Sequence, residues 1–254
     1  MKLGAIVRSC GERTERLCID SLKNELYKGD IKIIRNVYPF KETLKRCYST
    51  AIQEKFDWYL CVDADMIMIR GWRELLETRL RFLGDKIETE KIWELNFKLE
   101  DVVDPNPIGD LRIINNKYSN ELLYSYKQVK DSVKPEAAIC SNIIKRLKVT
   151  RAIFRNIIAY HGFDQYKRDV FNRFYIRACR DTSYVRKRGL FTEPLSDTDN
   201  IAKAGWDYGI EHREAKSLDA SKKIDITKLK YKELPPLDID LNCFYRMRDG
   251  EDVT

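Results

Sequence analysis

The sequence predicts an α/β fold in which helices flank a mostly parallel central sheet. Segments with a strand pattern alternate with amphipathic helical segments through the first third of the chain. Parallel neighbouring strands need crossover connections of this kind, which are usually helices. The chain has 254 residues, of which 43% are hydrophobic and 34% charged. This length and composition suit one large globular domain, or a domain with a smaller lobe.

The N-terminal part of the chain carries the clearest alternation. Each predicted strand is a short apolar run, and each predicted helix has its apolar residues on one face. In chain order the segments are strand 2–7, helix 12–26, strand 30–37, helix 41–55 and strand 58–65. Ligands bind beyond the carboxyl ends of the strands in sheets of this type. The residues that end these strands are therefore candidates for a functional site.

The alternation is less regular after residue 70. A half-exposed strand is predicted where apolar and polar residues alternate, and a loop where turn residues cluster. In chain order the segments are helix 71–85, strand 94–101, loop 102–110, strand 111–114, helices 119–131 and 134–147, strand 151–162 and helix 164–180. The residues after 205 lose periodicity, and we expect them to form a wrapping tail or a lid.

The charge distribution limits the class of partner. The formal net charge is +7, but 40 acidic residues are interleaved with 47 basic ones. This mixture argues against a nucleic-acid-binding arm and is compatible with an anionic small-molecule substrate. The most basic stretch, residues 172–189, has aromatic residues among its arginines. It is interpreted either as a solvated helix face with buried aromatics or as a contact for phosphate or acidic lipid.

The seven cysteines are scattered and form no CxxC pair. Zinc ligation is therefore not expected, and free thiols in a reducing compartment fit better. The N-terminal apolar run is too short for a signal peptide, and no segment approaches the length of a transmembrane span. We expect a cytoplasmic protein, with peripheral membrane contact through residues 172–189 as an open alternative.

The segment WYLCVDAD places two carboxylates at the end of an apolar strand. Asp63 and Asp65 are two residues apart, so in a strand they would point to the same side. Two converging carboxylates repel and raise each other's pKa unless a cation lies between them. Hard oxygen ligands suit Mg²⁺ or Mn²⁺, which are usually held by one or two carboxylates plus substrate phosphates. The segment therefore predicts a divalent-metal site, and a strand-end cap is the structural alternative.

Residues 1–75 resemble the GT-A glycosyltransferases, in the family-2-like form found in bacteria and viruses. The resemblance is carried by LGAIVRS at the N-terminus and by NVYPFKETLKRCYSTAIQEKFDWYLCVDADMIM. It implies a Rossmann-like GT-A fold with a smaller acceptor-side sheet and a C-terminal tail. It also implies Mn²⁺ or Mg²⁺ and a UDP-, GDP- or dTDP-linked sugar donor. In this interpretation Asp65 is a direct metal ligand, and Asp63 lies nearer the ribose or a metal-bound water.

The same resemblance divides the chain and suggests further donor contacts. Residues 1–110 would bind the nucleotide sugar, 111–205 would form the acceptor side, and 206–254 would pack on the domain or act as a lid. Candidate contacts to the donor are Arg8 and Ser9 after the first strand, Asn36 after the second, and Arg46, Lys41 or Lys45 on the following helix. A surface arginine, a turn residue and a solvated helix face are the respective structural alternatives.

His161 is one of two histidines and ends the last predicted strand. The resemblance makes it a candidate third metal ligand, and a structural histidine is the alternative. His212 is a weaker candidate for a functional role.

An inverting transferase needs a carboxylate base near the acceptor hydroxyl, but the family's ED dipeptide is absent from the expected region. The candidate bases are Glu193, Asp197 and Asp199, with Glu100, Asp101 and Asp104 as a second set. Since retaining transfer needs no such base, the stereochemistry stays open. Trp93, Trp206 and Tyr208 are candidates to stack on an acceptor sugar, with burial as the alternative.

The predicted function is metal-dependent transfer of a sugar from a nucleotide sugar to a hydroxyl of a glycan, a lipid-linked sugar or a protein-linked sugar. A haloacid-dehalogenase-type phosphatase also uses DxD after a strand, but its motif normally ends the first strand. A sugar nucleotidyltransferase would need a Gly-rich phosphate loop after the first strand, and SCGERTER has a single glycine. A non-catalytic nucleotide-sugar-binding module is the alternative from another class.

Overall fold

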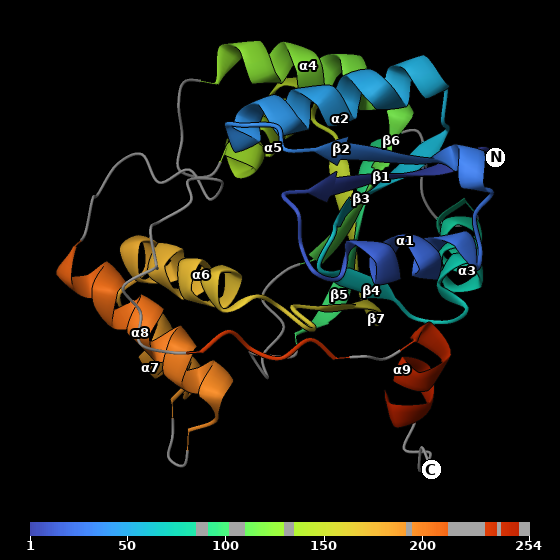
Figure 1. The fold of residues 1–254 in the computed structure, drawn as a ribbon. Coiled ribbons are helices and arrows are strands. Elements are labelled where there is room, and N and C mark those ends of the chain that lie inside the picture. Colours follow the sequence, from blue (N-terminus) through green and yellow to red (C-terminus); the bar gives the residue numbers. More distant parts are fainter. Residues whose placement is uncertain are drawn as a thin grey trace.

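The fold is α/β, with one seven-stranded sheet covered by helices on both faces (Figure 1). The computed structural model describes residues 1–84, 91–101, 110–129, 135–191, 195–212, 232–237 and 240–248. The strand order is β2-β1-β3-β6-β5-β7-β4. The strands are β1 (Leu3–Ser9), β2 (Ile31–Arg35), β3 (Trp58–Asp63), β4 (Met66–Met68), β5 (Ile92–Asp101), β6 (Asp110–Asn115) and β7 (Thr150–His161).

The sheet is mostly parallel, as predicted. Strands β1, β2, β3, β5 and β7 run in one direction, whereas β4 and β6 run in the other. The register pairs Arg8 with Asp63 on the neighbouring strands β1 and β3. The described residues do not form the separate smaller sheet expected on the acceptor side: β7 and β4 continue the main sheet, because β7 pairs with β5 along its length.

Two apolar layers fix the helices to the sheet (Figure 1). On one face, α1 (Glu15–Lys23) and α3 (Trp72–Gly84) pack against β1, β3 and β5 through residues such as Leu22 and Trp72. On the other face lie α2 (Phe40–Glu54), α4 (Ser119–Gln128) and α5 (Pro135–Leu147). Short 3₁₀ turns, η1 (Lys28–Asp30) and η3 (Asn116–Tyr118), lead into β2 and α4. Each strand and helix predicted before residue 181 is present.

A third apolar core joins α6 (Lys167–Arg180), α7 (Tyr184–Arg188) and α8 (Asp197–Glu211) beside the sheet. Helices α6 and α8 approach closely because α8 presents glycines to α6: a Cβ at Gly205 would lie 2.2 Å from the Phe171 carbonyl oxygen. Helix α8 is not among the helices predicted from sequence, since small residues give a weak hydrophobic pattern. The division proposed at residue 205 falls inside this helix.

The C-terminal segment returns to the sheet. Residues 232–237 pass the loop between β7 and α6, and α9 (Leu241–Arg248) packs against β4 (Figure 1). Phe244 and Tyr245 are buried there, and the Tyr245 hydroxyl donates to the Met68 carbonyl oxygen at 2.5 Å. This part of the expected tail is therefore anchored on the domain, whereas its action as a lid stays a prediction.

Candidate functional site

The turn after β3 is held by backbone contacts from three directions. The Ala64 amide donates to the Arg8 carbonyl oxygen at 3.0 Å, and the Thr14 hydroxyl donates to the Ala64 carbonyl oxygen at 2.9 Å. The Gly162 amide donates to the Asp65 carbonyl oxygen at 3.0 Å. Ala64 itself is fully buried. Loops from β1, α1 and β7 therefore fix the positions from which Asp63 and Asp65 project.

Asp63 is paired with Arg8 across the neighbouring strand ends. The Arg8 Nε donates to Asp63 Oδ1 at 2.7 Å, and the guanidinium lies over the Phe40 ring at 5.2 Å. Burial raises the pKa of Asp63; the Arg8 charge offsets part of this, while Asp65 and Glu136 raise it further. An additional cation here would be favourable, because it would stabilise the ionised form of Asp63.

Asp65 contacts His161 at the end of β7. The His161 Nε2 lies 3.3 Å from Asp65 Oδ2, and Nδ1 lies 2.8 Å from Asp101 Oδ2. A proton on Nδ1 would be donated to Asp101 and would leave the Nε2 lone pair directed at Asp65. A carboxylate behind an imidazole orients metal-binding histidines in this way.

Arg173 of α6 contacts Asp101 and His161 of this cluster. It pairs with Asp101, and its Nη2 lies 3.2 Å from His161 Nδ1. Burial and the neighbouring charge of Arg177 lower the pKa of Arg173 to about 9. Gly162 leaves room for the guanidinium, since a Cβ there would lie 2.5 Å from Arg173 Nη1.

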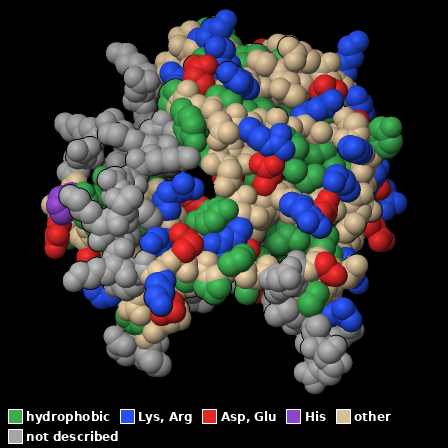
Figure 2. Space-filling model, viewed as in Figure 1, with side chains coloured by type: hydrophobic (Ala, Val, Ile, Leu, Met, Phe, Trp, Pro, Cys, Tyr) green, Lys and Arg blue, Asp and Glu red, His purple; other side chains and the backbone are tan. Residues whose placement is uncertain are grey.

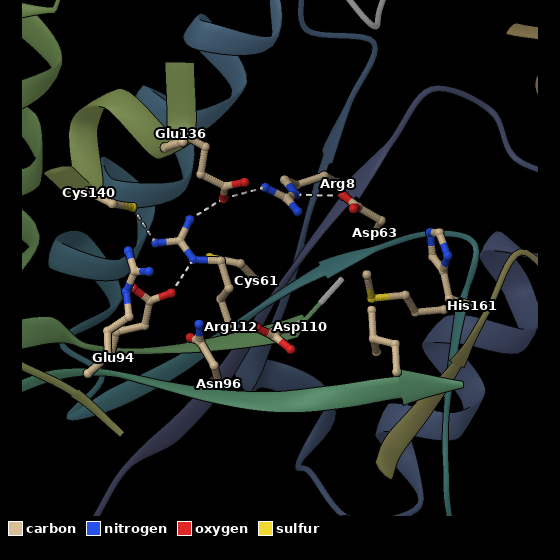
Figure 3. Close-up of a pocket in the computed structure, with 14 residues that line it drawn as sticks. Arg8, Cys61, Asp63, Glu94, Asn96, Asp110, Arg112, Glu136, Cys140 and His161 are labelled. Carbon is tan, nitrogen blue, oxygen red and sulfur yellow. Dashed lines mark hydrogen bonds and ion pairs between the residues drawn. The ribbon is translucent and has the colours of Figure 1, made fainter. Parts of the chain in front are cut away.

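A buried ion network extends from Arg8 along the sheet face under α5 (Figure 3). Glu136, in the first turn of α5, contacts Arg8 at 3.3 Å and also pairs with Arg112. The Arg112 Nε donates to Glu94 at 2.5 Å, and Arg151 donates to the other oxygen of Glu94 at 3.0 Å. Burial raises the pKa of Glu136, but the Arg112 and Arg8 charges outweigh it and the net shift is downward. Glu136 is thus ionised and fixed.

This network borders a cavity of about 360 Å³, which we call cavity one. In Figure 3, His161 lies at the opposite end of this cavity from Glu94 and Cys140, with Arg8 and Asp63 between them. Arginines, carboxylates and one amide dominate the wall. The lining residues are Arg8, Arg112, Arg151, Asp63, Glu94, Asp110, Glu136, Asn96, His161, Met66, Leu99, Ala137, Cys61 and Cys140.

A second cavity, cavity two, has about 390 Å³ and lies between the β7–α6 loop, the start of α8 and residues 232–237. Its wall comprises Gly162, Phe163, Asp164, Gln165, Val170, Ser196, Thr198, Asp199, Leu234, Pro235 and Leu237. The Gln165 Nε2 donates to Asp65 Oδ2 at 2.8 Å. Asp65 Oδ2 is thus contacted by His161, which lines cavity one, and by Gln165, which lines cavity two.

The residues at this edge fit a divalent ion that also binds substrate oxygens. Within the described ranges, no group of three or more His, Cys, Asp or Glu side chains is arranged to hold a metal ion by itself. Asp65 and His161 supply one oxygen and one nitrogen ligand in contact with each other. Mg²⁺ and Mn²⁺ are commonly held by few protein ligands plus substrate phosphates. The pair fits such an open site, while Asp63 is engaged by Arg8.

The residues expected from sequence to contact the donor do not all lie at the candidate site. Arg8 lines cavity one. Ser9 is buried, and its hydroxyl donates to Glu12 at 2.9 Å. Asn36 is an exposed turn residue with φ of 52°, whose amide donates to the Ser9 carbonyl oxygen at 2.9 Å. Arg46 is exposed on α2 and lines neither cavity. Of this set, the structure brings only Arg8 to Asp63 directly.

The candidate bases lie in different parts of the structure. Asp199 lines cavity two and forms a capping box with Ser196 at the start of α8. Asp197 is exposed in the same turn and lines neither cavity. Asp101 is paired with His161 and Arg173, and Glu100 lines neither cavity. Glu193 and Asp104 lie outside the described residues.

The aromatic candidates serve structural roles. Trp93 is fully buried under α5, and Trp206 is buried between α6 and α8. Tyr208 is partly exposed and stacks on His212 with ring centroids 4.1 Å apart. These four residues line neither cavity. Trp93 supports cavity one from behind its wall, because the Arg112 and Arg151 guanidinium groups lie over its ring, 5.7 and 5.5 Å from the centroid.

The basic stretch 172–189 does not form a uniformly solvated face. Arg173 points into the site, and the Arg177 guanidinium lies over Phe174 and Tyr184, 5.0 and 4.9 Å from the ring centroids. Figure 2 shows basic side chains scattered over one side of the molecule with acidic ones among them. Among the described residues, no helix has the length and apolar character needed to cross a membrane.

Sequence reasoning missed several residues that complete the site. They are Gln165 in the β7–α6 loop, Arg173 on α6, Glu136 on α5 and Arg112 on β6. Their local sequence carries no metal or nucleotide motif. The available signal was Gly162 immediately after His161, because glycine at a strand end indicates a positive φ or a close approach.

Comparisons with known proteins give structural similarity alone. No family model and no curated protein sequence matches the chain. A glycosyltransferase involved in glycosylation of the PBCV-1 major capsid has a TM-score of 0.45 and 8% identity, with 63% of this chain and 93% of that one covered. A cytidylyltransferase from Leptospira borgpetersenii has a TM-score of 0.41 and 10% identity, covering 80% and 93%. S. aureus TarS has a TM-score of 0.37 and 11% identity, covering 82% and 43%.

All three TM-scores are below 0.5 and all three identities are below 25%, so these similarities assign no activity to the chain.

Proposed function

We propose that the protein is a metal-dependent glycosyltransferase that moves a sugar from a nucleotide sugar to a hydroxyl acceptor. The observation that carries the proposal is the position of Asp65 Oδ2, contacted at 3.3 Å by His161 of cavity one and at 2.8 Å by Gln165 of cavity two. Group transfer needs two substrates that meet at one point. Each cavity has one lining residue, His161 or Gln165, that contacts this carboxylate, and this arrangement would bring the two substrates together.

The donor fits the edge formed by the ends of β1 and β3 and by cavity one. Arg8 would contact donor oxygens from the end of β1, and Asp65 and His161 would hold the divalent ion. That ion would supply a positive charge to the diphosphate as the sugar–oxygen bond breaks. Asn96 and the fixed carboxylates of Glu94 and Glu136 would accept hydrogen bonds from sugar hydroxyls.

The orienting contacts are already present without substrate. Asp101 fixes the His161 ring and is itself paired with Arg173, and Gln165 fixes one oxygen of Asp65. Such preorganisation lowers the cost of reaching the reactive geometry. Glu94 and Glu136 each contact two guanidinium groups, so their oxygens are already engaged and we assign them to binding.

The test is release of free nucleotide from a panel of UDP-, GDP- and dTDP-sugars, with Mn²⁺ or with EDTA. We expect release that needs the metal and is lost in Asp65→Asn. Glu74→Gln is the matched control, because Glu74 is exposed on α3 and lines neither cavity. Release that persists with EDTA, or in Asp65→Asn, would contradict the proposal.

The same variants distinguish the alternatives. In a DxD phosphatase Asp63 would be the nucleophile, but its Oδ1 is held by Arg8 at 2.7 Å. Hydrolysis of p-nitrophenyl phosphate that is lost in Asp63→Asn would favour that activity. Metal-dependent binding of a nucleotide sugar without nucleotide release under any condition would favour the non-catalytic module.

A further inference from the structure

We infer that cavity two is the acceptor site, and that its acceptor is an uncharged sugar or alcohol with an apolar flank. The inference rests on the proposed function, since it takes cavity one as the donor side. Cavity two reaches the candidate metal edge through Gln165, which donates to Asp65 Oδ2 at 2.8 Å. An acceptor in this cavity would therefore be one side chain away from that edge.

The charges in the two cavities are different. Cavity one has three arginines in its wall beside four carboxylates: Arg8, Arg112, Arg151, Asp63, Glu94, Asp110 and Glu136. Among the residues that the structure describes, no Lys or Arg lines cavity two, whereas Asp164 and Asp199 do. Phosphate groups are recognised by guanidinium and ammonium groups, and among the described residues only the wall of cavity one supplies them. The anionic donor thus fits cavity one, and a neutral acceptor fits cavity two.

The wall of cavity two is amphipathic. Phe163, Val170, Leu234, Pro235 and Leu237 are apolar, and Leu237 is 47% exposed at the surface. Sites for small organic ligands pair apolar surface with a few placed polar groups.

The polar groups are Gln165, Ser196, Thr198 and the two carboxylates. A carboxylate accepts hydrogen bonds from hydroxyl groups. An acceptor with hydroxyls on one side and CH groups on the other matches both parts of the wall.

The cavity is preformed by contacts that do not require a ligand. The Arg13 Nη1 donates to Asp164 at 3.1 Å, and Nη2 donates to the Leu234 carbonyl oxygen at 2.9 Å. Arg13 also lies over the Tyr166 ring, with 4.3 Å to its centroid. The Ser196 hydroxyl donates to Asp199 Oδ2 at 2.7 Å. Fixed walls reduce the ordering cost of binding.

The experiment measures glycoside binding without donor or metal. The probes are p-nitrophenyl β-glycosides of glucose, galactose, mannose and N-acetylglucosamine, with glucose 1-phosphate as the anionic comparison, in saturation-transfer NMR and calorimetry. We expect at least one glycoside to bind more tightly than glucose 1-phosphate. Thr198→Trp, which fills the cavity, should weaken that binding by about tenfold or more, equivalent to about 1.4 kcal/mol.

Lys203→Trp is the matched control, because Lys203 is exposed on the same helix and does not line the cavity. Leu237→Asp gives an independent test at an already exposed position, and it should weaken aryl glycosides more than methyl glycosides. Equal binding in wild type and Thr198→Trp, preference for glucose 1-phosphate, or no binding by any glycoside would overturn the inference. If binding behaves as expected but no donor is turned over, the proposed function fails while the carbohydrate site stands.

Discussion

Replacing Gly162 by alanine should disturb the site through two separate effects. Gly162 has φ of +80°, and a Cβ there would lie 2.5 Å from Arg173 Nη1. The left-handed backbone costs a non-glycine residue about 1–2 kcal/mol. Displacing the guanidinium would also weaken its bond to Asp101, and a hydrogen bond to a charged group contributes about 1.5–3 kcal/mol. The expected loss of unfolding free energy is therefore about 2.5–5 kcal/mol.

Gly71→Ala separates these effects. Gly71 has φ of +73°, and a Cβ there would meet no atom within 4 Å, so only the backbone term of about 1–2 kcal/mol applies. Urea denaturation of both variants gives the difference in unfolding free energy, and nucleotide release measures the activity of the site. The reasoning would be refuted if the two variants lost the same stability and Gly162→Ala kept full activity.

Three further results are expected. Glu136→Gln should destabilise the protein at pH 7 by about 3 kcal/mol, since it leaves Arg8 and Arg112 without their shared carboxylate. The net pKa shift of Glu136 is downward from 4.5. Its contribution to the unfolding free energy is therefore present above about pH 4.5 and is lost as the pH falls through the lower folded pKa. Urea denaturation of wild type and variant at pH 7 and pH 3.5 tests this, and a stability difference that does not change with pH would contradict it. Tyr245→Phe should cost about 1 kcal/mol by removing the hydrogen bond to the Met68 carbonyl oxygen, measured by thermal unfolding, and an unchanged midpoint would show that this bond contributes nothing. Arg13→Ala should increase proteolysis at residues 232–237 by releasing Leu234, while a cleavage rate equal to wild type would show that Arg13 does not hold this segment.

The fold class could be predicted because its signals are local. The apolar run from Trp58 to Val62 is short and rich in aromatic and branched residues, which is typical of a buried strand, and two strand–helix units precede it. The end of β3 at Asp63 follows from that pattern. The pairing of β7 with both β5 and β4 depends on contacts far apart in sequence, so the single continuous sheet could not be derived. Helix α8 was missed because Gly205 and Gly209 replace the usual large apolar residues at the contact with α6.

The candidate site was predictable only where it coincides with strand ends. Each of the four predicted residues lies within two residues of the end of a strand: Arg8, Asp63, Asp65 and His161. Arg173, by contrast, is one of several arginines in an amphipathic helix, and nothing in its local sequence separates it from exposed ones. What gives it a role is the absence of a Cβ at Gly162 and the presence of Asp101 on β5. Both are consequences of tertiary packing.

Calorimetric titration of Mn²⁺ in the presence and absence of UDP, GDP and dTDP tests the central claim most directly. The account predicts weak Mn²⁺ binding alone, because the described residues do not close a metal site, and much tighter binding with one nucleotide. It predicts that Asp65→Asn and His161→Asn lose this gain, whereas Glu74→Gln keeps it. Mn²⁺ affinity that no nucleotide changes, or a gain that persists in Asp65→Asn, would contradict a metal–diphosphate site at the end of β3.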